Sequence, residues 1–287
     1  MNIEALLASS LDGFMLGFIY GIAAMGLTLI YGVMRVINLA HGAVIALGMF
    51  AVYLLATQVG LNPYLGLIVV LFLGLGLGGV IYFVSIHRVI NERQLATLLA
   101  AFSVNLIIIG LGTAVFTTDP RTIDLSLGSF SAGTITILGT RIVSVLIACL
   151  VTAGLYYFLY RTRTGKSVRA VANNRAAAEL MGINTTGILA LSYGIGIMLA
   201  MISGGLIATL FSFTILAGST YQLKSFVIVV LGGLGNPTGA LLGGIILGVL
   251  EGVTTMFLPV GWVPVIEYVA FVLILLVRPH GLLGAQA

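Results

Sequence analysis

The sequence predicts an all-α bundle of about eight or nine transmembrane helices, one or two of them discontinuous or re-entrant. Hydrophobic residues make up 60% of the chain, charged residues only 7%, and the mean hydropathy is +1.21. A soluble domain of this composition would expose large apolar patches and aggregate. In lipid, spanning elements must satisfy their own backbone, which leaves helices or a closed barrel. Runs such as LIVVLFLGLGLGGVIYFVSI (67–86) lack the two-residue alternation of barrel strands, so we expect helices.

Eight apolar segments have lengths near the roughly 20 residues that a helix needs to cross a hydrocarbon core of about 30 Å. They are 13–33, 42–57, 64–86, 95–117, 142–160, 187–210, 239–257 and 261–277. A further segment, 225–234, is too short to span and is bounded by Lys224 and the break GGLGNPTG (232–239). We expect it to be a half-helix or a re-entrant piece. The number of crossings after residue 210 stays open, although Arg278 favours a cytoplasmic C-terminus.

A basic hydrophilic island at 161–184 orients the spans. Cytoplasmic loops carry an excess of Lys and Arg, and this island holds five of them against the single acid Glu179. With the island inside, alternation places 87–93 inside as well, whereas the N-terminus and 118–141 face outside. The inside loops then hold Arg35, Arg88, Arg93 and the five cations of the island, and the outside loops hold Arg121 and Arg141.

Two polar breaks resemble each other. RVINLAHGAVIALGMF (35–50) places Asn38 and His41, and LGGLGNPTGALLGGIILGVLE (231–251) places Asn236, just before a helix start rich in small residues. In transporters, paired discontinuous helices bring backbone dipoles and polar groups to the bilayer midplane. A plain interfacial turn between two spans explains the pattern equally well. On the first explanation, these three side chains line a substrate pathway.

Glycines recur at every fourth position in several spans. On a helix this spacing makes a smooth groove that lets another backbone approach closely, a main source of helix association in lipid. We expect these faces to pack within the bundle or against a second membrane subunit. The repeats are Gly13, Gly17 and Gly21; Gly244, Gly248 and Gly252; and Gly74 with Gly78.

Two acids, Glu251 and Glu267, fall inside the expected spans. An ionised carboxylate is costly in hydrocarbon, so each needs a partner, water or a protein contact. Either they belong to a pathway or relay, or they lie near the interface beside a hydrogen-bonding neighbour. The second explanation is favoured for Glu251, which lies near the end of its span.

The chain carries no enzyme motif. TGKS (164–167) looks like the end of a phosphate-binding loop, but the required earlier glycine is Tyr160 and no strand precedes it. The histidines His41, His87 and His280 lie in separate loops without metal-ligand spacing. No basic stripe alternates with aromatic residues, which argues against nucleic acid as a partner. We therefore expect no catalytic residue, metal site or cofactor in this chain.

Within the basic island, Asn173 or Asn174 can cap a helix over 175–181, and Gly182 is placed to end it. A helix of fewer than ten residues is only marginally stable alone in water. A docking partner would explain it, and a position on the bilayer surface is the alternative.

Four sequence blocks, in order over nearly the full length, resemble one family: the inner-membrane permeases of bacterial branched-chain amino acid ABC importers, of the LivH type. The blocks are GLTLIYGVMRVINLAHGAVIALG (26–48), NNRAAAELMGINT (173–185), VVLGGLGNPTGALLGGIILGVLE (229–251) and RPHGLLG (278–284).

The resemblance implies a single permease domain over 1–287 in the inner membrane, with a cytoplasmic coupling loop at 161–186. It implies a second related permease subunit, two cytoplasmic ATPases that bind ATP and Mg, and a periplasmic substrate-binding protein. Relatives in the family are assigned urea, short amides and aromatic acids, so the cargo and the identity of the second permease stay open. An ATP-independent secondary transporter or channel is the alternative. The coupling helix would comprise Arg175, Ala176, Ala177, Ala178, Glu179, Leu180, Met181 and Gly182.

Overall fold

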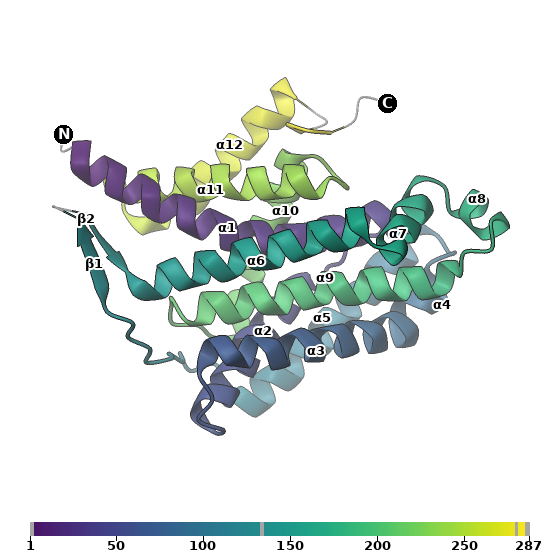
Figure 1. Cartoon of the computed structure of the whole chain (residues 1–287), viewed down its shortest axis with the longest axis horizontal. Helices are drawn as coiled ribbons and strands as arrows, with labels where there is room; N and C mark the ends of the chain where they lie inside the picture. The colour runs from purple at the N-terminus through teal and green to yellow at the C-terminus, as the bar shows by residue number, and fades with distance from the viewer. Residues whose placement is uncertain (1–2, 133–134, 279–280, 285–287) are drawn as a thin grey trace.

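The computed structural model describes residues 3–132, 135–278 and 281–284, so His280 lies outside the described residues. Helices dominate it (Figure 1). The helices are α1 (Ile3–Met34), α2 (His41–Thr57), α3 (Pro63–Ile81), α4 (His87–Val89), α5 (Gln94–Phe116), α6 (Gly139–Arg161), α7 (Arg163–Asn173), α8 (Arg175–Leu180), α9 (Thr185–Ala208), α10 (Gly218–Gly232), α11 (Pro237–Phe257) and α12 (Val263–Val277). A π-helical turn, η1 (Tyr82–Ile86), joins α3 to α4, and 3-10 turns occur at η2 (Ile215–Ala217) and η3 (Val260–Trp262).

The predicted all-α membrane bundle is confirmed. Among the described residues, eight helical stretches are long and apolar enough to cross a membrane, and α2, with 17 residues, is a shorter apolar helix. A two-stranded antiparallel hairpin, β1 (Ser129–Ala132) with β2 (Ile135–Leu138), lies in the loop expected outside. Figure 1 places the hairpin and the N-terminus at one end of the bundle, and α7, α8 and the C-terminal segment at the other. The second end carries the basic island and is therefore the cytoplasmic end.

The core of the bundle is built around α1. In α1, 89% of the most apolar stretch is buried inside the protein. The same share is 11% in α5 and 11% in α12, so those two helices face lipid or a partner. The glycine repeats explain why α1 can be so enclosed. A Cβ on Gly13 would overlap the backbone of Gly248, and one on Gly244 would overlap that of Gly21, so α1 and α11 touch backbone to backbone. Packing of these glycine faces within the bundle is thus confirmed.

The bounds expected for the short segment at 225–234, a half-helix or re-entrant piece, are wrong. The helix α10 begins at Gly218, and together with η2 it forms an 18-residue apolar stretch, Ile215–Gly232, that can span. Lys224 lies inside this stretch and is buried, rather than bounding it. A lysine in an apolar run predicts the end of a membrane segment, and the local sequence does not show which groups neutralise its charge.

Candidate functional site

The loop helix α8 is fixed at both ends by the residues that the sequence singled out. The Asn174 side chain accepts a hydrogen bond from the backbone N–H of Ala177 at 3.0 Å, as an N-cap does. At the other end Gly182 adopts φ +78°, a left-handed conformation that favours glycine. Its N–H donates to the carbonyl of Glu179 at 3.0 Å. The predicted short helix is therefore present, with defined ends.

The surface of α8 is unusual for a cytoplasmic loop. Ala178 is buried against the bundle, whereas Leu180 and Met181 are 89% and 81% exposed. Two large apolar side chains held out in water on one rigid turn are typical of a protein contact. A different residue of α8 holds it to the rest of the protein. Arg175 donates a hydrogen bond from Nη1 to Asn91 Oδ1 at 3.1 Å, which links α8 to the other cytoplasmic loop.

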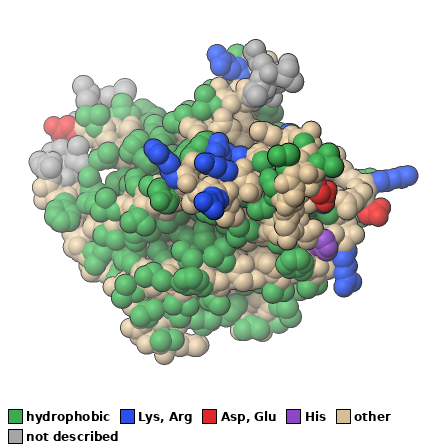
Figure 2. All heavy atoms as spheres, turned by 45° about the vertical axis from the view of Figure 1, so that its right-hand side comes forward, with side chains coloured by type: hydrophobic (Ala, Val, Ile, Leu, Met, Phe, Trp, Pro, Cys, Tyr) green, Lys and Arg blue, Asp and Glu red, His purple; other side chains and the backbone are tan. Residues whose placement is uncertain are grey.

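The helix α7 was not predicted, and it carries α8. The Thr162 hydroxyl caps its start by accepting from the Gly165 N–H at 3.0 Å, and Gly165 lies so close to the end of α6 that a Cβ would overlap its backbone. Val168 and Val171 are buried against the bundle. The signal was available in the sequence, as two apolar residues three apart between basic ones. Figure 2 shows Lys and Arg side chains gathered at this end of the molecule.

The first polar break starts a helix deep in the bundle. His41, fully buried, donates from Nε2 to the carbonyl of Ala23, in the middle of α1, at 2.9 Å. Beside it, the Gly42 N–H donates to Gln222 Oε1 of α10 at 3.2 Å. The Asn38 side chain is also buried; its Oδ1 accepts from the Ala40 N–H, and its Nδ2 has no partner within the described residues. The helix α2 therefore begins inside the bundle, as a discontinuous helix does.

The second break lies at the cytoplasmic end and does not meet the first. Asn236 is partly exposed and caps α11 by accepting from the N–H groups of Thr238 and Gly239. Its Nδ2 donates to the Leu283 carbonyl at 3.0 Å, which ties the C-terminal segment to the loop. A third contact comes from α1, where Gly32 packs against Gly235. Three of the four sequence blocks thus meet here, and Asn236 occupies the position of an interfacial turn.

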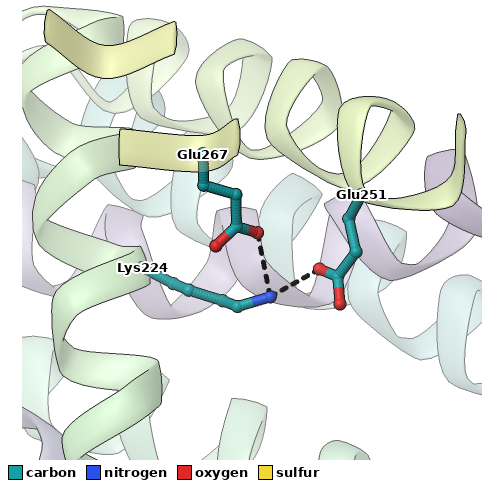
Figure 3. Close-up of polar contacts among 3 residues, drawn as sticks. All are labelled: Lys224, Glu251 and Glu267. Atoms are coloured by element: carbon teal, nitrogen blue, oxygen red, sulfur yellow. Dashed lines mark hydrogen bonds and ion pairs between the residues drawn. The ribbon is translucent and has the colours of Figure 1, made fainter. Parts of the chain in front are cut away.

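A buried charge cluster joins α10, α11 and α12 (Figure 3). Lys224 Nζ lies 2.6 Å from Glu251 Oε2 and 3.0 Å from Glu267 Oε1, and 4.9 Å from the centroid of the Tyr20 ring. The Glu267 side chain is 2% exposed and that of Lys224 8%. The two acids predicted to need a partner share the same lysine. The sequence did not identify Lys224 as the partner of these acids. Glu251 follows it by 27 residues and Glu267 by 43, and no local pattern shows that residues so far apart in the chain are in contact.

Most of the chain matches one family of membrane permeases. Residues 9–277 match the family model described as "Branched-chain amino acid transport system / permease component". The high-affinity branched-chain amino acid transport system permease protein LivH of Salmonella typhimurium is 29% identical over 95% of this chain and 94% of its own length. BraD of Pseudomonas aeruginosa has the same identity and coverage, and a probable LivH of Methanocaldococcus jannaschii is 28% identical over 92% and 88%.

Among solved structures, PsaBC from Streptococcus pneumoniae, in complex with Fab, matches with a TM-score of 0.50 over 92% of this chain and 89% of that chain. Its sequence identity of 15% restricts the likeness to the fold. The match of residues 9–277 is the decisive one, because it covers every membrane helix apart from the first turns of α1. This chain therefore belongs to the family of branched-chain amino acid transport permease components, as a multi-pass subunit of the inner membrane.

Proposed function

We propose that this chain forms the translocation pathway of an ATP-driven importer for branched-chain or other hydrophobic amino acids, working by alternating access. The cargo is proposed from the relatives, whose names specify branched-chain amino acids. Amides, urea and aromatic acids are the chemically related alternatives. The chain itself supplies no nucleotide-binding motif, so ATP and Mg would be bound by two partner ATPases.

The observation that carries the proposal is the exposed apolar turn on α8. Leu180 and Met181 are exposed on a turn that is capped at both ends and joined to α7 by Asn174 and to α9 by residues 181–184. A rigid turn of this kind transmits a push to the helices that hold it, whereas a flexible loop would absorb the push. We propose that the partner ATPases grip α8 through these side chains and that their closure tilts the bundle.

The discontinuous start of α2 is our proposal for the pathway. His41 and Asn38 bring polar atoms into a mostly apolar interior, next to the start of α2, where the helix dipole places partial positive charge. A mostly apolar passage with few polar groups suits aliphatic amino acids, because a strong site would retain a solute that a periplasmic binding protein has already selected. Asn236 remains a weaker candidate for this role, at the cytoplasmic end.

An ATP-independent transporter is the second candidate, and the buried cluster of Lys224, Glu251 and Glu267 is the observation in its favour, since such transporters use paired charges in their spans. Reconstitution with the partner subunits separates the two. Uptake that requires hydrolysable ATP supports the importer, and uptake driven by an ion gradient alone supports the alternative.

The coupling role of α8 is tested with a double substitution, Leu180→Asp with Met181→Asp. Both side chains are exposed, so the fold should persist while ATPase copurification and ATP-driven uptake fall at least tenfold. Val59→Asp, at an exposed apolar position of the opposite, outer end, is the matched control and should retain both. Normal copurification of the double variant would exclude α8 as the contact.

A further inference from the structure

A cavity of about 520 Å³ lies at the cytoplasmic end, apart from the exposed turn of α8. Its walls are the last turns of α1, the end of α6, the inner side of α7 and the loop between α10 and α11. This volume is in the range of small-molecule sites. The aliphatic side chains of Leu29, Val33 and Leu159 line it alongside polar groups.

The charged residue of the lining is Arg169. Its guanidinium lies 4.8 Å from the centroid of the Tyr160 ring, and within the described part of the chain it forms no ion pair. None of the residues that line the cavity is acidic. Arg169 is an exposed residue, so water solvates its guanidinium, and a carboxylate or phosphate that enters the cavity can pair with it.

A buried hydroxyl lies behind the wall of this space. Thr28 lines the cavity, is fully buried, and its Oγ1 has no hydrogen-bond partner among the described residues. Buried polar atoms in proteins are nearly always satisfied by protein, water or ligand. The Thr28 hydroxyl has no accessible surface, so a bound molecule would reach it only after the neighbouring side chains shift.

Helix ends of both polarities border the same cavity, namely the start of α11 and the ends of α1, α6 and α7. The start of α11, at Asn236 and Pro237, presents the positive end of a helix dipole, and the end of α1, at Gly32 and Val33, presents a negative one. A ligand that carries both charges on adjacent atoms satisfies both ends. The aliphatic part of the wall then accommodates an apolar side chain.

We propose that this cavity binds the zwitterion of an aliphatic amino acid from the cytoplasm. Its carboxylate pairs with Arg169 near the start of α11, its ammonium group faces the carbonyls at the end of α1, and its side chain packs on Leu29 and Leu159. The choice of an amino acid rests on the proposed function. A bound molecule joins α7 to α1 and α11, restrains the helix that carries α8, and so lets accumulated amino acid slow its own import.

Binding is measured with radiolabelled L-leucine on the full chain in phosphatidylcholine nanodiscs. Arg169→Gln should weaken binding at least tenfold. Lys166→Gln removes the same charge from α7 at an exposed position outside the cavity and should stay within twofold of the wild type. Leucinol, which lacks the carboxylate, should not compete.

Three results would overturn the proposal: equal leucine binding in the wild type and Arg169→Gln, displacement of leucine by inorganic phosphate, or loss of leucine binding when phosphatidylethanolamine is added to the nanodiscs. The last two would identify the cavity as a phosphate or lipid-headgroup site. Each variant is compared with the wild type only if the two proteins have equal thermal stability, so that a folding defect is not counted as lost binding.

Regulation is measured in proteoliposomes of the assembled importer, as the ratio of initial leucine uptake with and without leucine inside. We expect a ratio below one half for the wild type and Lys166→Gln, and near one for Arg169→Gln. A wild-type ratio near one would refute the feedback. If neither the wild type nor any variant shows ATP-dependent uptake, the proposed function is refuted. The nanodisc measurement would still show whether the cavity binds leucine.

Discussion

Replacing Lys224 by Met would leave the carboxylates of Glu251 and Glu267 facing each other inside the bundle without a cation. Removal of one partner from a buried ion pair typically costs about 3–5 kcal/mol, because the remaining charge is neither solvated nor paired. Here two carboxylates lose the same partner, at 2.6 Å and 3.0 Å. We therefore expect Lys224→Met to lower the free energy of unfolding by at least the upper part of that range. The thioether side chain keeps the volume, so the loss reports charge rather than packing.

The matched changes make the test specific. Glu267→Gln keeps one ion pair and removes the excess negative charge, so it should cost only about 1 kcal/mol, near the net value of one hydrogen bond. Combining Lys224→Met with both Glu→Gln changes should recover much of the loss, because partners in one network are not additive. Lys166→Met, on the exposed face of α7, should change stability by less than about 0.5 kcal/mol. Unfolding of the purified chain by SDS in mixed micelles measures all four. The argument fails if Lys224→Met is no more destabilising than Glu267→Gln.

Three further changes test packing, the deep polar break and the cytoplasmic cap. Gly248→Ala should cost about 1–3 kcal/mol in the same unfolding assay, because its Cβ would overlap the backbone of α1. The control is Gly154→Ala, whose Cβ would meet nothing within 4 Å and which should be neutral or slightly stabilising. Equal effects of the two changes would contradict the glycine argument. His41→Leu removes the hydrogen bond to α1 and should slow uptake in vesicles while leaving assembly intact; unchanged uptake removes His41 from the pathway. Asn236→Ala should cost about 1 kcal/mol and speed proteolysis of the C-terminal segment, and resistance equal to that of the wild type would show that the cap does not hold it.

Features that depend on neighbouring residues were predictable from the sequence. The membrane spans follow from hydrophobicity over about 20 residues, and their bounds in the structure differ by a few residues for most helices. The caps of α8 at Asn174 and Gly182 were also readable, because capping is a contact between residues three or four positions apart. The roles of these residues in coupling stay predictions.

Features that depend on distant residues were not predictable. From the local sequence, Lys224 is predicted to end a membrane segment. In the fold, carboxylates from two later helices neutralise its charge, so the segment continues past it. The two polar breaks look alike as sequence, but α2 starts beside the middle of α1 while Asn236 lies at the cytoplasmic end. Depth in the bundle is set by tertiary packing, and a local pattern of polar and small residues carries no information about it.

The backbone contact between α1 and α11 also dictates an order of events during synthesis. The two glycine faces are separated by more than two hundred residues, so α1 enters the bilayer long before its partner exists. Until α11 emerges, the groove of α1 is open to lipid and to any other helix that can approach it. A nascent chain that stalls before Pro237 would offer that groove to a neighbouring copy, and exchange of α11 between two copies is the misassembly that this architecture invites.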